Sequence, residues 1–129
     1  MLMYLSIIII IIIVIYIVYN MLNRNDNYVG GNDDSLAELT EYYIKQYGYT
    51  KEPVYALHYA DWCGHCKRVK PIWSKIKGSG IKSKMLEVDE ETSHTPGVKS
   101  YPTIIKYHKG IVTVYKGERE EFALRQWLQ

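Results

Sequence analysis

Two cysteines separated by two residues are the part of this chain best suited to chemistry. They are Cys63 and Cys66, and the 129 residues contain no others. An apolar run of strand length ends just before them and helical spacing follows, which predicts both thiols in the first turn of a helix. The free N–H groups and the dipole at a helix start stabilise a thiolate. We therefore expect Cys63 to be the attacking thiol and Cys66 to resolve the mixed disulfide.

The two residues between the cysteines, Gly64 and His65, are expected to tune this redox chemistry. His65 is a polar and potentially cationic neighbour of the first thiol. Such a neighbour favours the thiolate of Cys63 and so makes the disulfide form more oxidising than an apolar pair would.

Two other uses of a lone cysteine pair have less support. Zinc needs four ligands, and since no second CxxC or HxxxH pattern is present, His58 or His94 would have to complete the set. A purely structural disulfide closing so short a loop would add little stability. We expect no metal and no cofactor.

The first 23 residues predict a transmembrane helix that anchors the chain in a lipid bilayer. They carry no charged side chain, every position from Ile7 to Ile15 is isoleucine or valine, and tyrosines stand towards the ends at Tyr4, Tyr16 and Tyr19. A cleaved signal peptide is the alternative, but no Lys or Arg precedes the apolar run and no small-residue cleavage site follows it. A buried β-strand of this length would be unusual.

Residues 24–33 predict a flexible linker, because Asn, Asp and Gly dominate them, and residues 34–129 predict one compact domain. Arg24 follows the apolar segment and weakly favours a cytosolic domain, although one charge cannot fix the orientation. The chain has 16 basic and 14 acidic residues, interspersed along the soluble part, so we expect no nucleic-acid partner.

The spacing of apolar residues predicts a small α/β domain with a mixed sheet. Its first two strands are expected to be parallel, because a helix joins them, and the last two form a hairpin. The expected helices are 35–47, 63–77 and 118–128, and the expected strands are 54–60, 84–88, 103–108 and 111–115.

The stretch from Tyr59 to Lys67, which reads YADWCGHCK, closely resembles the active-site segment of protein disulfide isomerase domains in the thioredoxin superfamily. The similarity continues through Pro71, the Val88-Asp89 pair and the segment 97–103, and covers roughly residues 50–129. It implies a thioredoxin-like fold, with a central mixed four-stranded sheet flanked by helices.

The resemblance also implies roles for residues outside the cysteine motif. Pro102 would be a cis-proline beside the cysteines, and the backbone of Tyr101 would pair with an extended substrate peptide. Trp62 would flank the active site as a further substrate-binding residue. Arg119 matches an arginine that approaches the resolving cysteine and lowers its pKa, so it would be a third redox-tuning residue.

Three departures from the family pattern are visible. Leu57 stands where the family usually has a buried carboxylate that relays the proton of the resolving thiol, so proton transfer at Cys66 is expected to be slow. His58 is adjacent, but neighbouring strand residues point to opposite faces. The stretch 90–95 is shorter than the family's helix there, and the usual first strand before Ser35 is not recognisable.

These features predict a membrane-bound thiol–disulfide oxidoreductase that forms or rearranges disulfides in protein substrates. The resemblance favours a lumenal or extracytosolic domain that is recycled by a redox partner the sequence does not identify. One alternative is a cytosol-facing, thioredoxin-like reductase, which Arg24 weakly favours. The other is a thioredoxin-fold module that holds client proteins and whose catalysis is weakened by Leu57.

Overall fold

The protein is represented by a computed structural model that describes residues 1–22 and 34–129. The chain divides into two compact units between residues 32 and 33. The linker predicted at residues 24–33 lies outside the described residues and stays a prediction.

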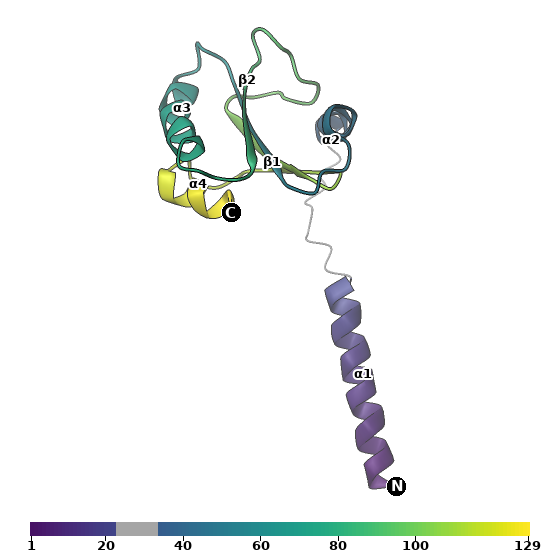
Figure 1. The fold of residues 1–129 in the computed structure, drawn as a ribbon. Helices are drawn as coiled ribbons and strands as arrows, with labels where there is room; N and C mark the ends of the chain where they lie inside the picture. The colour runs from purple at the N-terminus through teal and green to yellow at the C-terminus, as the bar shows by residue number, and fades with distance from the viewer. Residues whose placement is uncertain (23–33) are drawn as a thin grey trace. The chain divides into compact units, whose positions relative to one another are not determined.

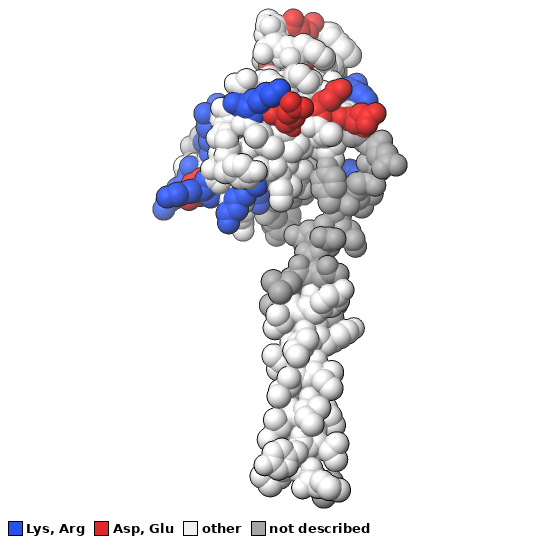
Figure 2. All heavy atoms as spheres, turned by 90° about the vertical axis from the view of Figure 1, so that its right-hand side faces the viewer, with Lys and Arg blue, Asp and Glu red and all other residues white. Residues whose placement is uncertain are grey.

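Helix α1 (Leu2–Leu22) makes up the described part of the first unit. Figure 2 shows it without a basic or acidic side chain, as its sequence requires. The isoleucines from Ile7 to Ile13 are each half exposed or more. Among residues 1–22 and 34–129, no helix meets the length and apolarity of a membrane span. The helical conformation predicted for this segment is therefore present, whereas the predicted transmembrane span is not confirmed.

The second unit is built on a four-stranded mixed sheet in the order β2-β1-β3-β4. Its strands are β1 (Val54–Tyr59), β2 (Lys84–Asp89), β3 (Thr103–His108) and β4 (Ile111–Val114). Strands β1 and β2 run parallel, with Tyr59 opposite Asp89, while β1/β3 and β3/β4 are antiparallel. The predicted mixed sheet, with its first two strands parallel, is confirmed.

Three helices cover the two faces of the sheet (Figure 1). Helix α2 (Asp34–Tyr47) lies on one face, and α3 (Gly64–Lys77) and α4 (Glu121–Trp127) lie on the other. A hydrophobic core lies on each face of the sheet, and successive side chains of β1 point into the two cores alternately. Val54 and Ala56 pack with α2, whereas Tyr55 and Leu57 pack with α3 and α4. Because β1 is covered on both sides, its side chains from Val54 to His58 are all buried.

Two segments differ from the sequence prediction. Helix α4 begins at Glu121 instead of residue 118, because the Tyr115 N–H still pairs with the Ile104 carbonyl and the Tyr115 hydroxyl binds the Glu118 carbonyl. These contacts keep residues 115–120 out of the helix. The connection from 90 to 102 contains turns and no helix. Its length and its polar residues suit turns, and the carbonyl of Asp89 accepts from the N–H groups of Thr92 and Ser93.

Candidate active site

The two cysteines lie where β1 passes into α3, at the carboxyl ends of the parallel strands. Cys63 is the N-cap of α3, with φ −78° and ψ 115°, and its N–H donates to the Ala60 carbonyl. Its sulfur accepts from the N–H of Cys66 at 3.3 Å, as a capping side chain does. The predicted strand-to-helix junction is therefore present, and it holds the Cys63 sulfur at the positive end of the helix.

The two thiols are free and differ in exposure. Cys63 is 6% exposed and Cys66 is fully buried, and both pack against Ala60 with Tyr59 and Tyr101 at the edge of the cluster. Cys63 is therefore slightly more accessible to solvent than Cys66.

The proton affinities of the two thiols also differ. Burial raises the pKa of Cys63, but the hydrogen bond from the Cys66 thiol and those from the backbone N–H groups of Cys66 and His65 together lower it below its ordinary value. Burial and the same hydrogen bond to Cys63 raise the pKa of Cys66 to about 11. Cys66 thus keeps its proton and donates it in a hydrogen bond to the Cys63 thiolate.

The loop before β3 forms one wall of the site. The Tyr101–Pro102 peptide bond is cis, Pro102 is buried, and the Tyr101 carbonyl lies 3.5 Å from the Cys63 sulfur. The ring of Trp62 meets that of Tyr101 edge-on, with 6.0 Å between centroids, and Trp62 is 69% exposed. Trp62, Tyr101 and Pro102, which the family resemblance associates with the substrate, are thus brought together around Cys63.

Gly64, His65 and Arg119, the residues expected to tune the redox chemistry, differ in their effect on the pKa of the two cysteines. Arg119 is exposed, and its charge lowers the pKa of both Cys63 and Cys66 by smaller amounts than the hydrogen bonds do. His65 is exposed in the first turn of α3 and contributes its backbone N–H to Cys63. A Cβ at Gly64 would meet no atom within 4 Å, so glycine is not required there for space.

Leu57 lies in the apolar core that α3 covers. It is fully buried and packs with Val69, which lies one turn beyond Cys66. From the sequence, His58 was expected to be a poor substitute for the missing carboxylate because it should point to the opposite face, and it does lie on that face, against Tyr43 of α2. Among the described residues, no group of three or more His, Cys, Asp or Glu side chains could hold a metal ion.

A buried polar network escaped the sequence analysis. The Nδ1 atom of His58 lies 2.6 Å from Oε1 of Glu90, and its Nε2 lies 2.8 Å from the Tyr43 hydroxyl. The His58 and Glu90 side chains are both fully buried. A histidine inside an otherwise apolar strand was the signal that could have indicated such a partner, but the pattern could not identify Glu90 as that partner.

Comparison with known protein sequences identifies relatives for most of this domain. A family model described as Thioredoxin matches residues 37–129. The chain is 33% identical over 105 residues to protein disulfide isomerase-like 2-1 of Oryza sativa subsp. japonica, covering 74% of this chain and 28% of that protein. It is 34% identical over 87 residues to the protein disulfide-isomerase of Humicola insolens, covering 61% and 17%. The chain thus spans well under half the length of these relatives.

Solved structures show the same fold. The structure of full-length ERdj5 superposes with a TM-score of 0.58 at 20% identity, covering 68% of this chain and 15% of that one. The thioredoxin of Malassezia sympodialis superposes with a TM-score of 0.52 at 23% identity, covering 66% of this chain and 79% of that one. At these identities the likeness establishes the fold alone.

Proposed function

Because the chain belongs to the thioredoxin family, we propose that it is a thiol–disulfide oxidoreductase of protein substrates that forms or rearranges disulfides. The observation that carries the proposal is the unequal pair of thiols at the start of α3. Cys63 has a lowered pKa and slight exposure, and Cys66 is buried with a pKa of about 11. This inequality assigns the attacking role to Cys63 and the resolving role to Cys66.

The reaction proceeds by two exchanges. The Cys63 thiolate attacks one sulfur of a substrate disulfide, forms a mixed disulfide and releases the other substrate sulfur as a thiolate. Cys66 then loses its proton and attacks the Cys63 sulfur, which frees the second substrate sulfur and leaves Cys63 and Cys66 joined. The reverse sequence transfers the disulfide to a reduced substrate, and a mixed disulfide attacked by another substrate thiol rearranges the substrate's own bonds.

The site favours the oxidising and rearranging directions. The hydrogen bonds that lower the pKa of Cys63 stabilise the reduced form of the pair, which makes its disulfide a better oxidant. The high proton affinity of Cys66, and an apolar Leu57 where the family usually has a carboxylate, are expected to slow resolution, so that a mixed disulfide lasts longer and rearrangement has more time. The similarity to proteins named disulfide isomerases supports the same direction.

Substrate binding is proposed at the wall that surrounds Cys63. Trp62 offers an exposed aromatic face, and the backbone of Tyr101 can pair with an extended peptide beside the buried Pro102. Gly64, His65 and Arg119 are proposed to set the potential of the cysteine pair. A redox partner must return the pair to its starting state after each transfer.

The reduction potential of the cysteine pair tests the direction. The full chain, kept soluble in detergent, is equilibrated with mixtures of reduced and oxidised glutathione, and free thiols are trapped by alkylation. A potential near about −180 mV supports an oxidase or isomerase, whereas a potential near about −270 mV supports the alternative of a cytosol-facing reductase. Failure to form a disulfide between Cys63 and Cys66 would contradict the oxidoreductase proposal.

The Cys66→Ser variant separates an enzyme from a client-holding module. Without the resolving thiol, an enzyme accumulates mixed disulfides at Cys63 with its protein substrates, while a holding module binds the same clients without a covalent bond. The variant lacking both cysteines is the matched control, because it keeps the fold and removes the chemistry.

We also propose that α1 attaches the chain to a lipid bilayer. The helix has no charged side chain, and its half-exposed isoleucines would lose apolar contact with water on entering lipid. Flotation of the full chain with phosphatidylcholine vesicles tests this, and recovery of the chain away from the vesicles would contradict it. Labelling of the cysteines with a membrane-impermeant thiol reagent in intact vesicles isolated from cells then reports which side carries the domain.

A further inference from the structure

A buried three-residue network lies beside the active site and takes no part in the exchange described above. It joins Tyr43 of α2, His58 of β1 and Glu90 of the connection that follows β2. The His58 and Glu90 side chains are completely buried, and Oε2 of Glu90 also accepts from the N–H of Thr95 at 2.7 Å. Both carboxylate oxygens of Glu90 are therefore used, and the network as a whole joins α2, β1 and the connection after β2.

The hydrogen bonds of the network assign its protons. A neutral His58 donates from Nδ1 to Glu90 and accepts at Nε2 from the Tyr43 hydroxyl, so both ring nitrogens have a hydrogen-bond partner. The exposed His94 also approaches Oε2 of Glu90, at 3.8 Å. Because an unpaired carboxylate would be costly at this depth, these donors are what keep Glu90 inside the domain.

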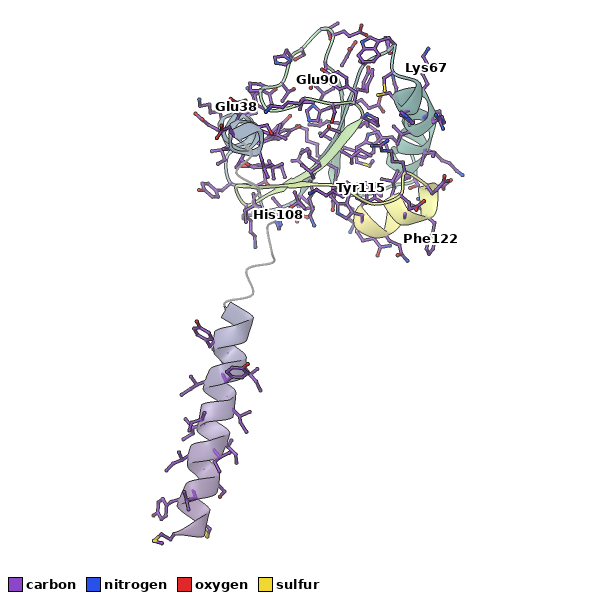
Figure 3. All side chains as sticks on the ribbon, turned by 180° about the vertical axis from the view of Figure 1, so that it is seen from behind. Glu38, Lys67, Glu90, His108, Tyr115 and Phe122 are labelled. Carbon is purple, nitrogen blue, oxygen red and sulfur yellow. The ribbon has the colours of Figure 1, made fainter. Side chains whose placement is uncertain are left out.

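The connection that Glu90 holds is the one that leads to the active site. Thr95, bound through its N–H to Glu90, accepts from the N–H of Val98, and Val98 is buried in the core beneath α2. Three residues later comes Tyr101, whose carbonyl lies 3.5 Å from the Cys63 sulfur. In Figure 3, Glu90 lies toward the same end of the domain as Lys67, the residue after Cys66.

We propose that Tyr43, His58 and Glu90 are positioning residues for disulfide exchange, which fix the connection 90–102 and thereby hold Tyr101 and Pro102 in place to receive a substrate peptide. The inference rests on the proposed function. It goes beyond it because none of the three residues touches a sulfur or the substrate. The network acts through the placement of the backbone at Tyr101.

A proton taken up by the network would loosen this arrangement. Protonated His58 carries a hydrogen on Nε2, so the Tyr43 hydroxyl loses its acceptor there. The ionisable groups that face the pair are Tyr43 from α2, Glu90 and His94 from the connection, and Tyr101 from the loop before β3. Burial lowers the pKa of His58, so His58 becomes protonated only in acidic solution, below the ordinary histidine value of 6.5.

The test compares two substrates with the full chain in detergent. One is a synthetic extended peptide with a single disulfide, which needs the Tyr101 backbone, and the other is the small reagent bis(2-hydroxyethyl) disulfide, which needs only Cys63. We expect Glu90→Gln to raise KM for the peptide about three- to tenfold and to change the rate with the small disulfide less than about twofold. Glu87→Gln on β2 is the matched control and leaves both unchanged.

Substitutions at the histidine sharpen the test. His58→Asn keeps an amide donor toward Glu90, so it is expected to raise KM less than His58→Phe does. It is also expected to remove the rise in KM that we predict for the native chain below pH 6.5. Tyr43→Phe deletes a single hydroxyl and gives a usable variant even if the others unfold. It is expected to raise peptide KM by about twofold.

The outcomes separate the two proposals. If the native chain reacts with neither disulfide, the proposed function fails. If it reacts with both, and the Glu90, His58 and Tyr43 variants that remain folded keep the native KM and pH profile, the network is only structural and this inference is wrong. Faster amide exchange at Thr95 and Val98 in Glu90→Gln, measured without substrate, is expected alongside the rise in KM.

Discussion

The two neighbouring sulfurs of the cysteine pair differ in proton affinity. Cys63 gains hydrogen bonds from backbone N–H groups because it caps α3, while Cys66, three residues on, faces the interior. One local turn of helix therefore gives two chemically identical side chains different surroundings: a slightly exposed thiol with a lowered pKa and a fully buried thiol with a raised pKa.

Alkylation by iodoacetamide should report this difference directly. The reduced chain is expected to react at Cys63 first, with a rate that rises with pH and levels off below the ordinary cysteine value of 9.0, because the pKa of Cys63 is lowered. Cys66 should stay unmodified until the pH approaches about 11. Peptide mass spectrometry over a pH series measures both sites. Earlier labelling of Cys66 would contradict the assignment of roles, and Cys63→Ser is the control for Cys66 alone.

We expect the apolar side chain of Leu57 to slow the resolution of a mixed disulfide, because it replaces a carboxylate that could accept a proton. Leu57→Glu places a carboxylate in the apolar cluster beside Val69. The family resemblance implies that a carboxylate at this position accepts the proton of the resolving thiol, so we expect resolution to be faster by about tenfold or more. Burying the carboxylate should lower the free energy of unfolding by about 2–4 kcal/mol. Rapid acid quenching measures how fast the mixed disulfide decays, and Leu57→Gln is the polar control that cannot accept a full proton. Equal decay in the Glu and Gln variants would rule out proton relay.

At the scale of elements, the backbone of the connection 90–102 passes very close to the backbone of α2 at Gly97. A Cβ on Gly97, where φ is +84°, would lie 2.0 Å from the Ser35 carbonyl oxygen and 2.8 Å from the Leu39 nitrogen. Both atoms belong to the backbone of α2, so no side-chain rearrangement can relieve the overlap. Glycine at this position is what allows the connection to pass beneath the helix.

Gly97→Ala should therefore be far more harmful than alanine at another left-handed glycine. We expect a loss of at least about 2 kcal/mol in the free energy of unfolding, because steric overlap adds to backbone strain. Gly80→Ala is the matched control, since its φ is +85° but its Cβ would meet nothing within 4 Å, and we expect it to cost about 1 kcal/mol. Urea unfolding measures both, and equal losses would contradict the steric explanation.

The elements that could be predicted are those whose signal is local. Apolar runs and turn residues identified all four strands, and the cysteine motif identified the strand-to-helix junction, because each signal lies within a few residues of the element it defines. The start of α4 was predicted three residues early, since the contacts of Tyr115 that keep residues 115–120 out of the helix have no sequence signature.

The same holds for the candidate site: the residues within local motifs could be predicted, and a contact between distant residues could not. Cys63, Cys66 and the loop at Tyr101 follow from motifs, whereas the pairing of His58 with Glu90 joins residues 32 positions apart and depends on the parallel register of β1 and β2. Register places Tyr59 opposite Asp89 and so brings the residues at both strand ends together. A linear pattern carries no such information.

At the scale of the whole molecule, the buried histidine makes stability depend on pH. Burial lowers the pKa of His58 below 6.5, so in acid the unfolded chain takes up a proton that the folded domain does not. Stability contributed by this group is present above pH 6.5 and is lost as the pH falls below it.

Urea unfolding on either side of pH 6.5 tests the sign. We expect the midpoint of the native chain to fall in acid, and the fall to be smaller in His58→Asn, which cannot titrate. His108→Asn, at a histidine bound to the Lys51 carbonyl near the surface, should retain the native pH dependence. A fall of equal size in all three chains would assign the acid effect to other groups.

The burial of Cys66 also limits what can happen when two copies of the chain meet under oxidising conditions. With one sulfur slightly exposed and the other enclosed, two copies can be crosslinked only through Cys63 on each side. Each half of such a crosslink then lies beside its own Cys66, which can break it and release the neighbour. If Cys66 resolves disulfides as proposed, such crosslinks should be transient, and oxidation should end in separate chains with internal disulfides.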